Sequence, residues 1–235
     1  MAYLPLESNP AVFNKAARAL GASTQILAFD DVLGLDPELL AFVPKPCYAL
    51  CLLLPGELAK ARRATLEPPP PSFKAPYFIE QADALGNACG TVGLIHALAA
   101  AVQQGAAAAL AENSALATFL ERTESASCTE RGQALLASAE IRALSDAAAA
   151  SGETEGAGTD DAQDQHFVTF VRCGDALWEL DGRNIRDAGA FAVCHGKTSA
   201  DTFVLDAGAL IREDFMARRP DELRFVVTAL SQVSE

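Results

Sequence analysis

The segment Tyr48–Leu54 places the strongest constraint on what this 235-residue chain folds into. The segment is continuously apolar, without the alternating polar positions of a half-buried strand. It is far shorter than the roughly 20 apolar residues that a membrane span needs, and it has the length of a strand. A strand without a polar face is stable only when both of its faces are covered. The fold therefore needs a sheet that lies between two other layers.

Capping signals predict helices around this strand. Asn9-Pro10 supplies an N-cap and a first helical residue, and Gly21 a stop, which predicts a helix of about 10 residues. By the same patterns we expect further helices from Asp36, from Cys89 through the alanine-rich segment, over Thr129–Leu144 and over Asp201–Arg218, and further strands at Thr24–Phe29, His166–Arg172, Leu177–Leu180, Phe191–Val193 and Leu223–Leu230. This mixture predicts an α/β fold whose central, mostly antiparallel sheet is flanked by helices on both sides.

Two segments have the composition of exposed connections. Glu57–Lys74 is charged and includes the proline run Pro68–Pro71, which predicts a linker with polyproline character. Ser145–Gln165 carries acidic residues and glycines but no basic residue, which predicts a long loop. No break in composition divides the chain into two cores, so residues 1–235 are predicted to form a single domain.

The charge balance narrows the class of partner. The chain has 31 acidic and 18 basic residues, for a formal net charge of -13. Nucleic acid is disfavoured as a partner because its phosphates would be repelled. An acidic surface instead favours encounter with a basic protein, although it also serves solubility alone. The N-terminus has no basic region ahead of an apolar stretch, and no apolar run reaches membrane-spanning length, so we expect a cytoplasmic protein without membrane contact.

The six cysteines do not indicate a metal site or a disulfide framework. None has the paired C-x-x-C spacing of a zinc site, and the chain offers only three histidines as further ligands. In a reducing compartment the thiols are expected to be free. Cys47 and Cys51 lie in or beside the apolar strand and are expected to be core residues. We therefore predict neither a metal nor a cofactor.

A hairpin brings a histidine and an aspartate together. If Gly174-Asp175 is a two-residue loop between two strands, His166 lies opposite Arg183, and Asp181 becomes the diagonal neighbour of His166. Diagonal neighbours lie about 7–8 Å apart at the backbone, within reach of a histidine–carboxylate hydrogen bond. Asp181 would then hold the imidazole in one tautomer and favour its protonated form. The alternative is that Asp181-Gly182 only forms a turn.

Cys89 is the candidate nucleophile. It stands where a turn becomes a helix, and the amides and positive dipole of a helix N-terminus lower the pKa of a thiol. Together with His166 and Asp181 it provides the thiolate, the base and the group that orients the base, which thiol catalysis requires. A buried structural cysteine is the alternative. His96, inside an apolar helix, is expected to be a core residue, and His195 precedes a glycine in a loop.

Several ordered motifs resemble the ubiquitin C-terminal hydrolase family in its short, single-domain form. The spacing between His166 and Asp181 is also that of the family. The resemblance runs from end to end, over Leu4-Pro5-Leu6-Glu7-Ser8-Asn9-Pro10, Gly34-Leu35-Asp36-Pro37-Glu38-Leu39-Leu40, Val43-Pro44-Lys45-Pro46, Asn87-Ala88-Cys89-Gly90-Thr91-Val92-Gly93-Leu94-Ile95-His96, His166-Phe167, Leu180-Asp181-Gly182-Arg183 and Asp221-Glu222-Leu223-Arg224-Phe225.

The resemblance implies a papain-like, knotted cysteine peptidase. It implies a monomeric thiol hydrolase of the cytoplasm or nucleus that cleaves amide, ester or thioester bonds at the C-terminal glycine of ubiquitin, with no cofactor. The loop at residues 145–165 would cross the active-site cleft and admit only small or unfolded leaving groups. Residues expected to bind ubiquitin are Pro5, Leu6, Glu7, Asp31 and Glu222, and the acidic ones among them would meet its basic side chains.

One position departs from the family pattern. The glutamine that stabilises the oxyanion normally stands six residues before the cysteine, where this chain has Asp83, while Gln81 stands eight before. A carboxylate would repel a developing oxyanion. We therefore expect a two-residue insertion that bulges outward and leaves Gln81 as the donor.

The alternative functions are a catalytically impaired ubiquitin-binding protein and a papain-like hydrolase acting on a ubiquitin-like modifier.

Overall fold

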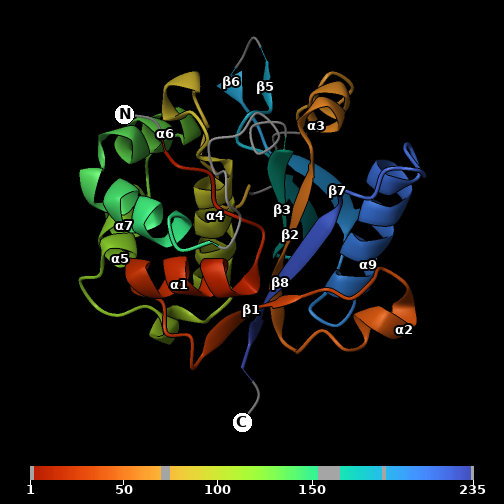
Figure 1. Ribbon diagram of the computed structural model, residues 1–235, viewed down its shortest axis with the longest axis horizontal. Coiled ribbons are helices and arrows are strands. Elements are labelled where there is room, and N and C mark those ends of the chain that lie inside the picture. The colour runs from red at the N-terminus through yellow and green to blue at the C-terminus, as the bar shows by residue number, and fades with distance from the viewer. Residues whose placement is uncertain (1–2, 70–74, 153–164, 187–188, 234–235) are drawn as a thin grey trace.

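A six-stranded antiparallel sheet forms the centre of the computed structural model, which describes residues 3–69, 75–152, 165–186 and 189–233 (Figure 1). The strand order is β1-β8-β2-β3-β4-β7, and two short strands, β5 and β6, form a separate ribbon. The strands are β1 (Leu27–Asp31), β2 (Cys47–Pro55), β3 (Gln165–Cys173), β4 (Ala176–Leu180), β5 (Ile185–Arg186), β6 (Gly189–Ala190), β7 (Val193–Lys197) and β8 (Val226–Gln232).

Helices cover both faces of the sheet, as predicted (Figure 1). On one face lie α1 (Pro10–Leu20) and α4 (Cys89–Gln103), with α5 (Ala115–Arg122), α6 (Cys128–Ala137) and α7 (Ala139–Ala149) outside them. On the other face lie α2 (Pro37–Leu40), α3 (Gly56–Arg63) and α9 (Phe203–Leu210), which continues into the π-helical turn η3 (Ile211–Met216). Two 3-10 turns, η1 (Asp83–Leu85) and η2 (Ala107–Ala109), flank α4. None of the helices in the described ranges has the length and apolarity that crossing a bilayer requires.

Strand β2 is buried on both faces, which confirms the prediction for Tyr48–Leu54. All of its residues are buried, and from Ala49 to Leu54 successive side chains enter opposite cores. The core under α1 and α4 receives Ala49, Cys51 and Leu53, and the core under α9 receives Leu50, Leu52 and Leu54. Cys47 and Cys51 are core residues, as expected, and burial raises the pKa of Cys51 to about 12.

The first helix begins and ends at the predicted residues. The Asn9 side chain accepts a hydrogen bond from the Ala11 amide at 2.8 Å, and Gly21 has a φ of 107°, in the left-handed region that favours glycine. Three predicted strands are displaced along the chain. Thr24–Ile26 forms a turn, so β1 begins only at Leu27, and the strands predicted at Phe191 and Leu223 begin at Val193 and Val226.

The prediction that Glu57–Lys74 is an exposed linker is wrong for its first part. Helix α3 extends to Arg63, with Ala59 and Arg62 buried. The Arg62 guanidinium donates two hydrogen bonds to the Glu179 carboxylate on β4, at 2.7 and 3.1 Å. Arg62 is therefore the partner of a buried acid. The charged composition of this segment predicts only exposed side chains and does not indicate such a pairing. Residues 70–74 lie outside the described ranges.

Two further boundaries differ from prediction. The helix expected over Thr129–Leu144 is two helices, because the Ser138 hydroxyl caps α7 by accepting a hydrogen bond from the Ile141 amide at 3.3 Å. The loop expected over 145–165 is wrong at both ends, since Ser145 lies in α7 and Gln165 begins β3. The Ser145 hydroxyl is buried and lies 2.6 Å from that of Thr91 in α4. The intervening residues 153–164 lie outside the described ranges.

Candidate active site

Cys89 is the first residue of α4 and is partly exposed. The helix packs on β2 and β3, and the next residue, Gly90, makes the close approach possible. A Cβ atom at Gly90 would lie 2.8 Å from Leu6 Cβ and 3.3 Å from a ring carbon of Phe167. Only glycine lets the N-terminus of the helix, and with it the Cys89 sulfur, lie this close to the strand.

His166 meets the sulfur from strand β3. It pairs with Leu54 of β2 in the sheet, and only 3% of its side chain is exposed. The imidazole forms a side-chain hydrogen bond with Cys89, and the backbone of Phe167 bonds to the same sulfur. The sheet register and the start of the helix thus bring together two residues that lie far apart in the sequence.

Asp181 follows the last residue of β4 and holds the imidazole. The β3–β4 hairpin has the predicted register, and Asp181 Oδ1 lies 2.6 Å from His166 Nε2. Since Nε2 faces the carboxylate, Nδ1 is the ring nitrogen left to face Cys89. Oδ1 also accepts a hydrogen bond from the Arg183 amide at 2.9 Å, and Oδ2 accepts one from Arg63 at 2.8 Å.

The electrostatics of this cluster favour a thiolate beside an imidazolium. Burial lowers the pKa of His166, but the charge and hydrogen bond of Asp181, with those of Cys89, outweigh it and raise the pKa to about 9. Burial likewise raises the pKa of Cys89, yet the hydrogen bond and charge of His166 bring it below its ordinary value. The pKa of Asp181 is lowered despite burial by His166 and Arg63, so it remains a carboxylate.

Gln81 is buried just ahead of Cys89, whereas Asp83 is exposed in the η1 turn. The backbone N–H of Gln81 donates a hydrogen bond to the Gly182 carbonyl at 2.7 Å, and its side-chain Nε2 donates one to the Gly86 carbonyl at 2.9 Å. Gly182 allows this packing, because a Cβ atom there would lie 3.0 Å from Gln81 Cβ. The η1 turn, with Asp83 exposed, thus lies between the buried Gln81 and Cys89.

The other two histidines lie outside this cluster. His96 is buried in α4, as expected of a core residue, and its Nε2 accepts a hydrogen bond from the Ile79 amide at 2.9 Å. Burial lowers the pKa of His96 to about 3, so it stays neutral and fixes the segment that leads to Gln81. His195 Nε2 lies 2.8 Å from Glu179 Oε2, beside Arg62.

The residues expected to bind ubiquitin lie in three places. Pro5, Leu6 and Glu7 form the segment beside the start of α4, with Leu6 buried and the other two partly exposed. Asp31 is exposed at the end of β1, three strands from β3. Glu222 accepts hydrogen bonds from the Arg224 guanidinium at 2.7 and 2.9 Å and from its amide, and these bonds lower its pKa to about 2.

Sequence reasoning missed Arg63 and Arg183. Arg63 lies in the segment expected to be a linker, and Arg183 is expected only as a register position and as part of a family motif, without a role of its own. Its guanidinium donates to the Gly86 carbonyl at 2.9 Å, the acceptor that Gln81 also uses. The sequence signal that could have indicated a role for Arg63 is its position next to Arg62. Two adjacent arginines in a chain with a large excess of acidic residues suggest acidic partners. In the described part of the chain, no group of three or more histidine, cysteine or acidic side chains is arranged to hold a metal.

Comparison with known proteins agrees with this geometry. Residues 3–217 match the Peptidase C12 family, described as ubiquitin carboxyl-terminal hydrolase, family 1. A ubiquitin carboxyl-terminal hydrolase of Aplysia californica is 39% identical over 93% of this chain and 97% of its own length. The ubiquitin carboxyl-terminal hydrolase isozyme L1 of Homo sapiens is 36% identical over 98% of this chain and 98% of its own length.

A solved structure has the same fold. The catalytic domain of UCH37 from Trichinella spiralis, bound to ubiquitin vinyl methyl ester, superposes with a TM-score of 0.76 at 25% identity, over 100% of this chain and 97% of that one. The mixed architecture of this chain is thus that of a papain-like catalytic domain. By its sequence match and its fold, the chain belongs to the ubiquitin carboxyl-terminal hydrolase family.

Proposed function

We propose that this protein is a deubiquitinating cysteine hydrolase that cleaves amide, ester or thioester bonds at the C-terminal glycine of ubiquitin. The observation that carries the proposal is the contact between Cys89, His166 and Asp181 at the N-terminus of α4. The relatives support ubiquitin as the substrate, since those compared are named ubiquitin carboxyl-terminal hydrolases and the Trichinella domain was solved with ubiquitin vinyl methyl ester.

The first half of the reaction forms an acyl-enzyme. The Cys89 thiolate attacks the carbonyl carbon of the terminal glycine of ubiquitin and forms a C–S bond, while the carbonyl electrons move onto oxygen. His166 enters this step protonated and gives its Nδ1 proton to the leaving amine, alcohol or thiol as the tetrahedral intermediate collapses. The products are a ubiquitin thioester on Cys89 and a neutral His166.

The second half hydrolyses the thioester. Neutral His166 takes a proton from a water molecule, which attacks the same carbonyl carbon. Collapse of the second intermediate breaks the C–S bond and releases ubiquitin with a terminal carboxyl group, which loses its proton to solvent, and Cys89 leaves as a thiolate beside the protonated imidazole. Asp181 holds the ring in one orientation through both steps and stabilises its charge.

We assign the oxyanion donors to Gln81 and the Cys89 amide. The Gln81 side-chain nitrogen has two hydrogens, and the Gly86 carbonyl occupies only one of them. Its position is fixed by Gly182 and by the segment that His96 holds. The negative charge of Asp83 and its exposed position in η1 support Gln81 over Asp83 in this role.

Acidic and apolar side chains together favour ubiquitin, a protein with basic side chains, as the partner. Leu33 and Phe42 are 74% and 73% exposed, and with Asp31 they line a groove of about 350 Å³ near the end of β1. Large exposed apolar side chains beside acids are the composition of a protein-binding surface. We assign Asp31, with Pro5, Leu6, Glu7 and Glu222, to ubiquitin contact.

Finer features of the function remain predictions. We expect a monomer of the cytoplasm or nucleus in which residues 1–235 form one catalytic domain. A preference for small or unfolded adducts depends on residues 153–164, which lie outside the described ranges, and the knotted path of the chain is likewise expected from the family.

Hydrolysis of a ubiquitin C-terminal fluorogenic amide tests the proposal. The wild-type protein should turn over, Cys89→Ala should lose turnover while still binding ubiquitin, and Cys194→Ala, at another partly exposed cysteine, should retain it. Turnover that survives Cys89→Ala would exclude the assigned nucleophile. A wild-type protein that binds ubiquitin without turnover would instead be the impaired ubiquitin-binding protein, and turnover only of a ubiquitin-like substrate would identify the other alternative.

A further inference from the structure

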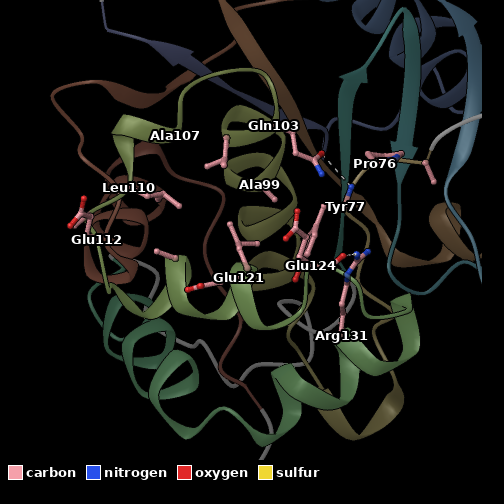
Figure 2. Close-up of a pocket in the computed structure, with 15 residues that line it drawn as sticks. Pro76, Tyr77, Ala99, Gln103, Ala107, Leu110, Glu112, Glu121, Glu124 and Arg131 are labelled. Atoms are coloured by element: carbon pink, nitrogen blue, oxygen red, sulfur yellow. Dashed lines mark hydrogen bonds between the residues drawn. The ribbon is translucent and has the colours of Figure 1, made fainter.

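A cavity lies at the opposite end of α4 from Cys89. It has a volume of about 720 Å³ and lies between the C-terminal half of α4, the segment Ala75–Tyr77, the η2 region and α5 (Figure 2). Cys89 and Gln103 are the first and last residues of a 15-residue helix, so at 1.5 Å per residue the two ends lie about 21 Å apart. The cavity is therefore separate from the candidate active site.

Most of the residues that line the cavity are apolar. Ala99 and Val102 of α4 form its floor, and Leu110, Ala117 and Leu120 line it from the η2 and α5 side. Alanines at the contact positions leave space that larger side chains would fill. The volume is within the range of about 300–1,000 Å³ that is usual for ligand pockets.

The rim is acidic. Glu112, Glu121 and Glu124 are exposed around the cavity, and in the described ranges none of the three carboxylates forms an ion pair (Figure 2). An apolar floor under a negative rim is complementary to a ligand with an apolar body and positive charge.

Among the described residues that line the cavity, the one basic residue, Arg131, is already engaged. The Arg131 guanidinium lies 4.2 Å from the centroid of the Tyr77 ring. It donates hydrogen bonds to the backbone carbonyls of Thr123, Phe78 and Glu124 at 3.0, 3.3 and 2.7 Å. Its donors are directed to the protein backbone, so it closes the end of the cavity and does not offer a site for an anion.

We propose that this cavity binds a basic peptide segment in which an aliphatic or aromatic side chain stands between lysine or arginine residues. The apolar side chain would occupy the space over Ala99 and Ala117, and the flanking cations would meet Glu121 and Glu124. Because the cavity is remote from Cys89, binding does not depend on the hydrolase activity. The proposal therefore stands or falls independently of the function assigned above.

The experiment uses a fluorescein-labelled, capped pentapeptide with the sequence Gly-Lys-Phe-Lys-Gly and a control in which glutamate replaces both lysines. Fluorescence anisotropy with the full chain should show saturable binding of the basic peptide only, weakening as salt is added. Glu121→Gln with Glu124→Gln should weaken binding roughly fivefold. Glu38→Gln with Glu140→Gln, which removes the same charge elsewhere, should change affinity less than twofold.

Two further arms locate the peptide. Ala117→Phe should fill the cavity and abolish binding, with an unchanged circular dichroism spectrum showing that the variant folds, and alkylation of Cys89 should leave affinity unchanged. Absence of saturable binding, equal binding of the acidic control, or loss of binding on Cys89 alkylation would overturn the proposal.

Discussion

The Nε2 atom of His166 lies 2.6 Å from Oδ1 of Asp181, and each of these side chains is only 3% exposed. The second oxygen of the carboxylate is engaged by Arg63 at 2.8 Å. Asp181 thus lies between a guanidinium and an imidazole, and it can neither rotate nor take up a proton without losing several bonds. The imidazole is held in one orientation toward Cys89.

Asp181→Asn should preserve the size of this side chain and remove its charge. We expect kcat to fall by about 100-fold or more, because the amide cannot stabilise the imidazolium and can stabilise the wrong tautomer. KM for a ubiquitin amide should change little, since Asp181 is buried and does not meet substrate. The measurement is steady-state kinetics, and a variant with wild-type kcat would show that Asp181 does not orient His166.

Arg63→Ala tests the support behind Asp181. Loss of the 2.8 Å bond to Oδ2 should lower kcat about tenfold, which corresponds to about 1.4 kcal/mol, with KM unchanged. Lys60→Ala, an exposed basic residue on the same helix, is the matched control and should have no effect. Equal kinetics of the two variants would mean that Arg63 contributes only to the surface charge.

The oxyanion assignment separates two neighbouring residues. Gln81→Ala should lower kcat by about 100-fold or more, and Asp83→Ala should leave it near the wild-type value. Kinetics of both variants with the fluorogenic ubiquitin amide provide the comparison. A large loss at Asp83 with no loss at Gln81 would contradict the bulge at η1.

The pH dependence of kcat/KM follows from the paired ionisations. Activity requires the Cys89 thiolate, so it should fall as pH drops through the lowered pKa of that thiol. Activity also requires the protonated imidazole, so it should fall as pH rises through about 9. In Asp181→Asn the main cause of the raised His166 pKa is removed, and the alkaline limb should shift to lower pH. An alkaline limb that does not move would contradict the account.

His96 should affect stability in a pH-dependent way. His96→Phe keeps an aromatic ring next to Phe78 but leaves the Ile79 amide without its acceptor, which should cost about 1–3 kcal/mol at pH 7. The native pKa of His96 is lowered to about 3, so protonation of this residue costs stability in the wild-type protein, and not in the variant, as pH falls from about 6.5 toward 3. Urea unfolding at about pH 7 and pH 4.5 should show the difference between the two proteins narrowing at the lower pH. A difference that widens would indicate a protonated His96.

Local signals in the sequence predicted the parts of the fold that depend on local chemistry. Asn9 and Gly21 define a helix by their own hydrogen bonds and dihedral angles, and Gly174-Asp175 fixes the register of a hairpin. Helix α3 was missed because its stability comes from contacts distant in sequence. The partner of Arg62 is Glu179, 117 residues away, and no local pattern reveals that pairing.

The candidate site was predictable to different depths. The contact between His166 and Asp181 follows from the hairpin alone, whereas the approach of Cys89 requires α4 to pack on β3. The family resemblance predicted that Cys89 lies close to His166 and that ubiquitin is the substrate. Composition alone predicts neither. The role of Arg63 could not be predicted from the sequence, for the same reason as α3. It depends on the carboxylate of Asp181, which is distant in the sequence and follows β4.

The central claim is that Cys89 is a thiolate activated by His166 and placed to meet the end of ubiquitin. Reaction with ubiquitin vinyl methyl ester, followed by intact and peptide mass spectrometry, tests it most directly. We predict one adduct per chain, on Cys89, with His166→Ala slowing its formation about 100-fold or more. Modification at another cysteine, or equally fast labelling of Cys89 without His166, would contradict the account.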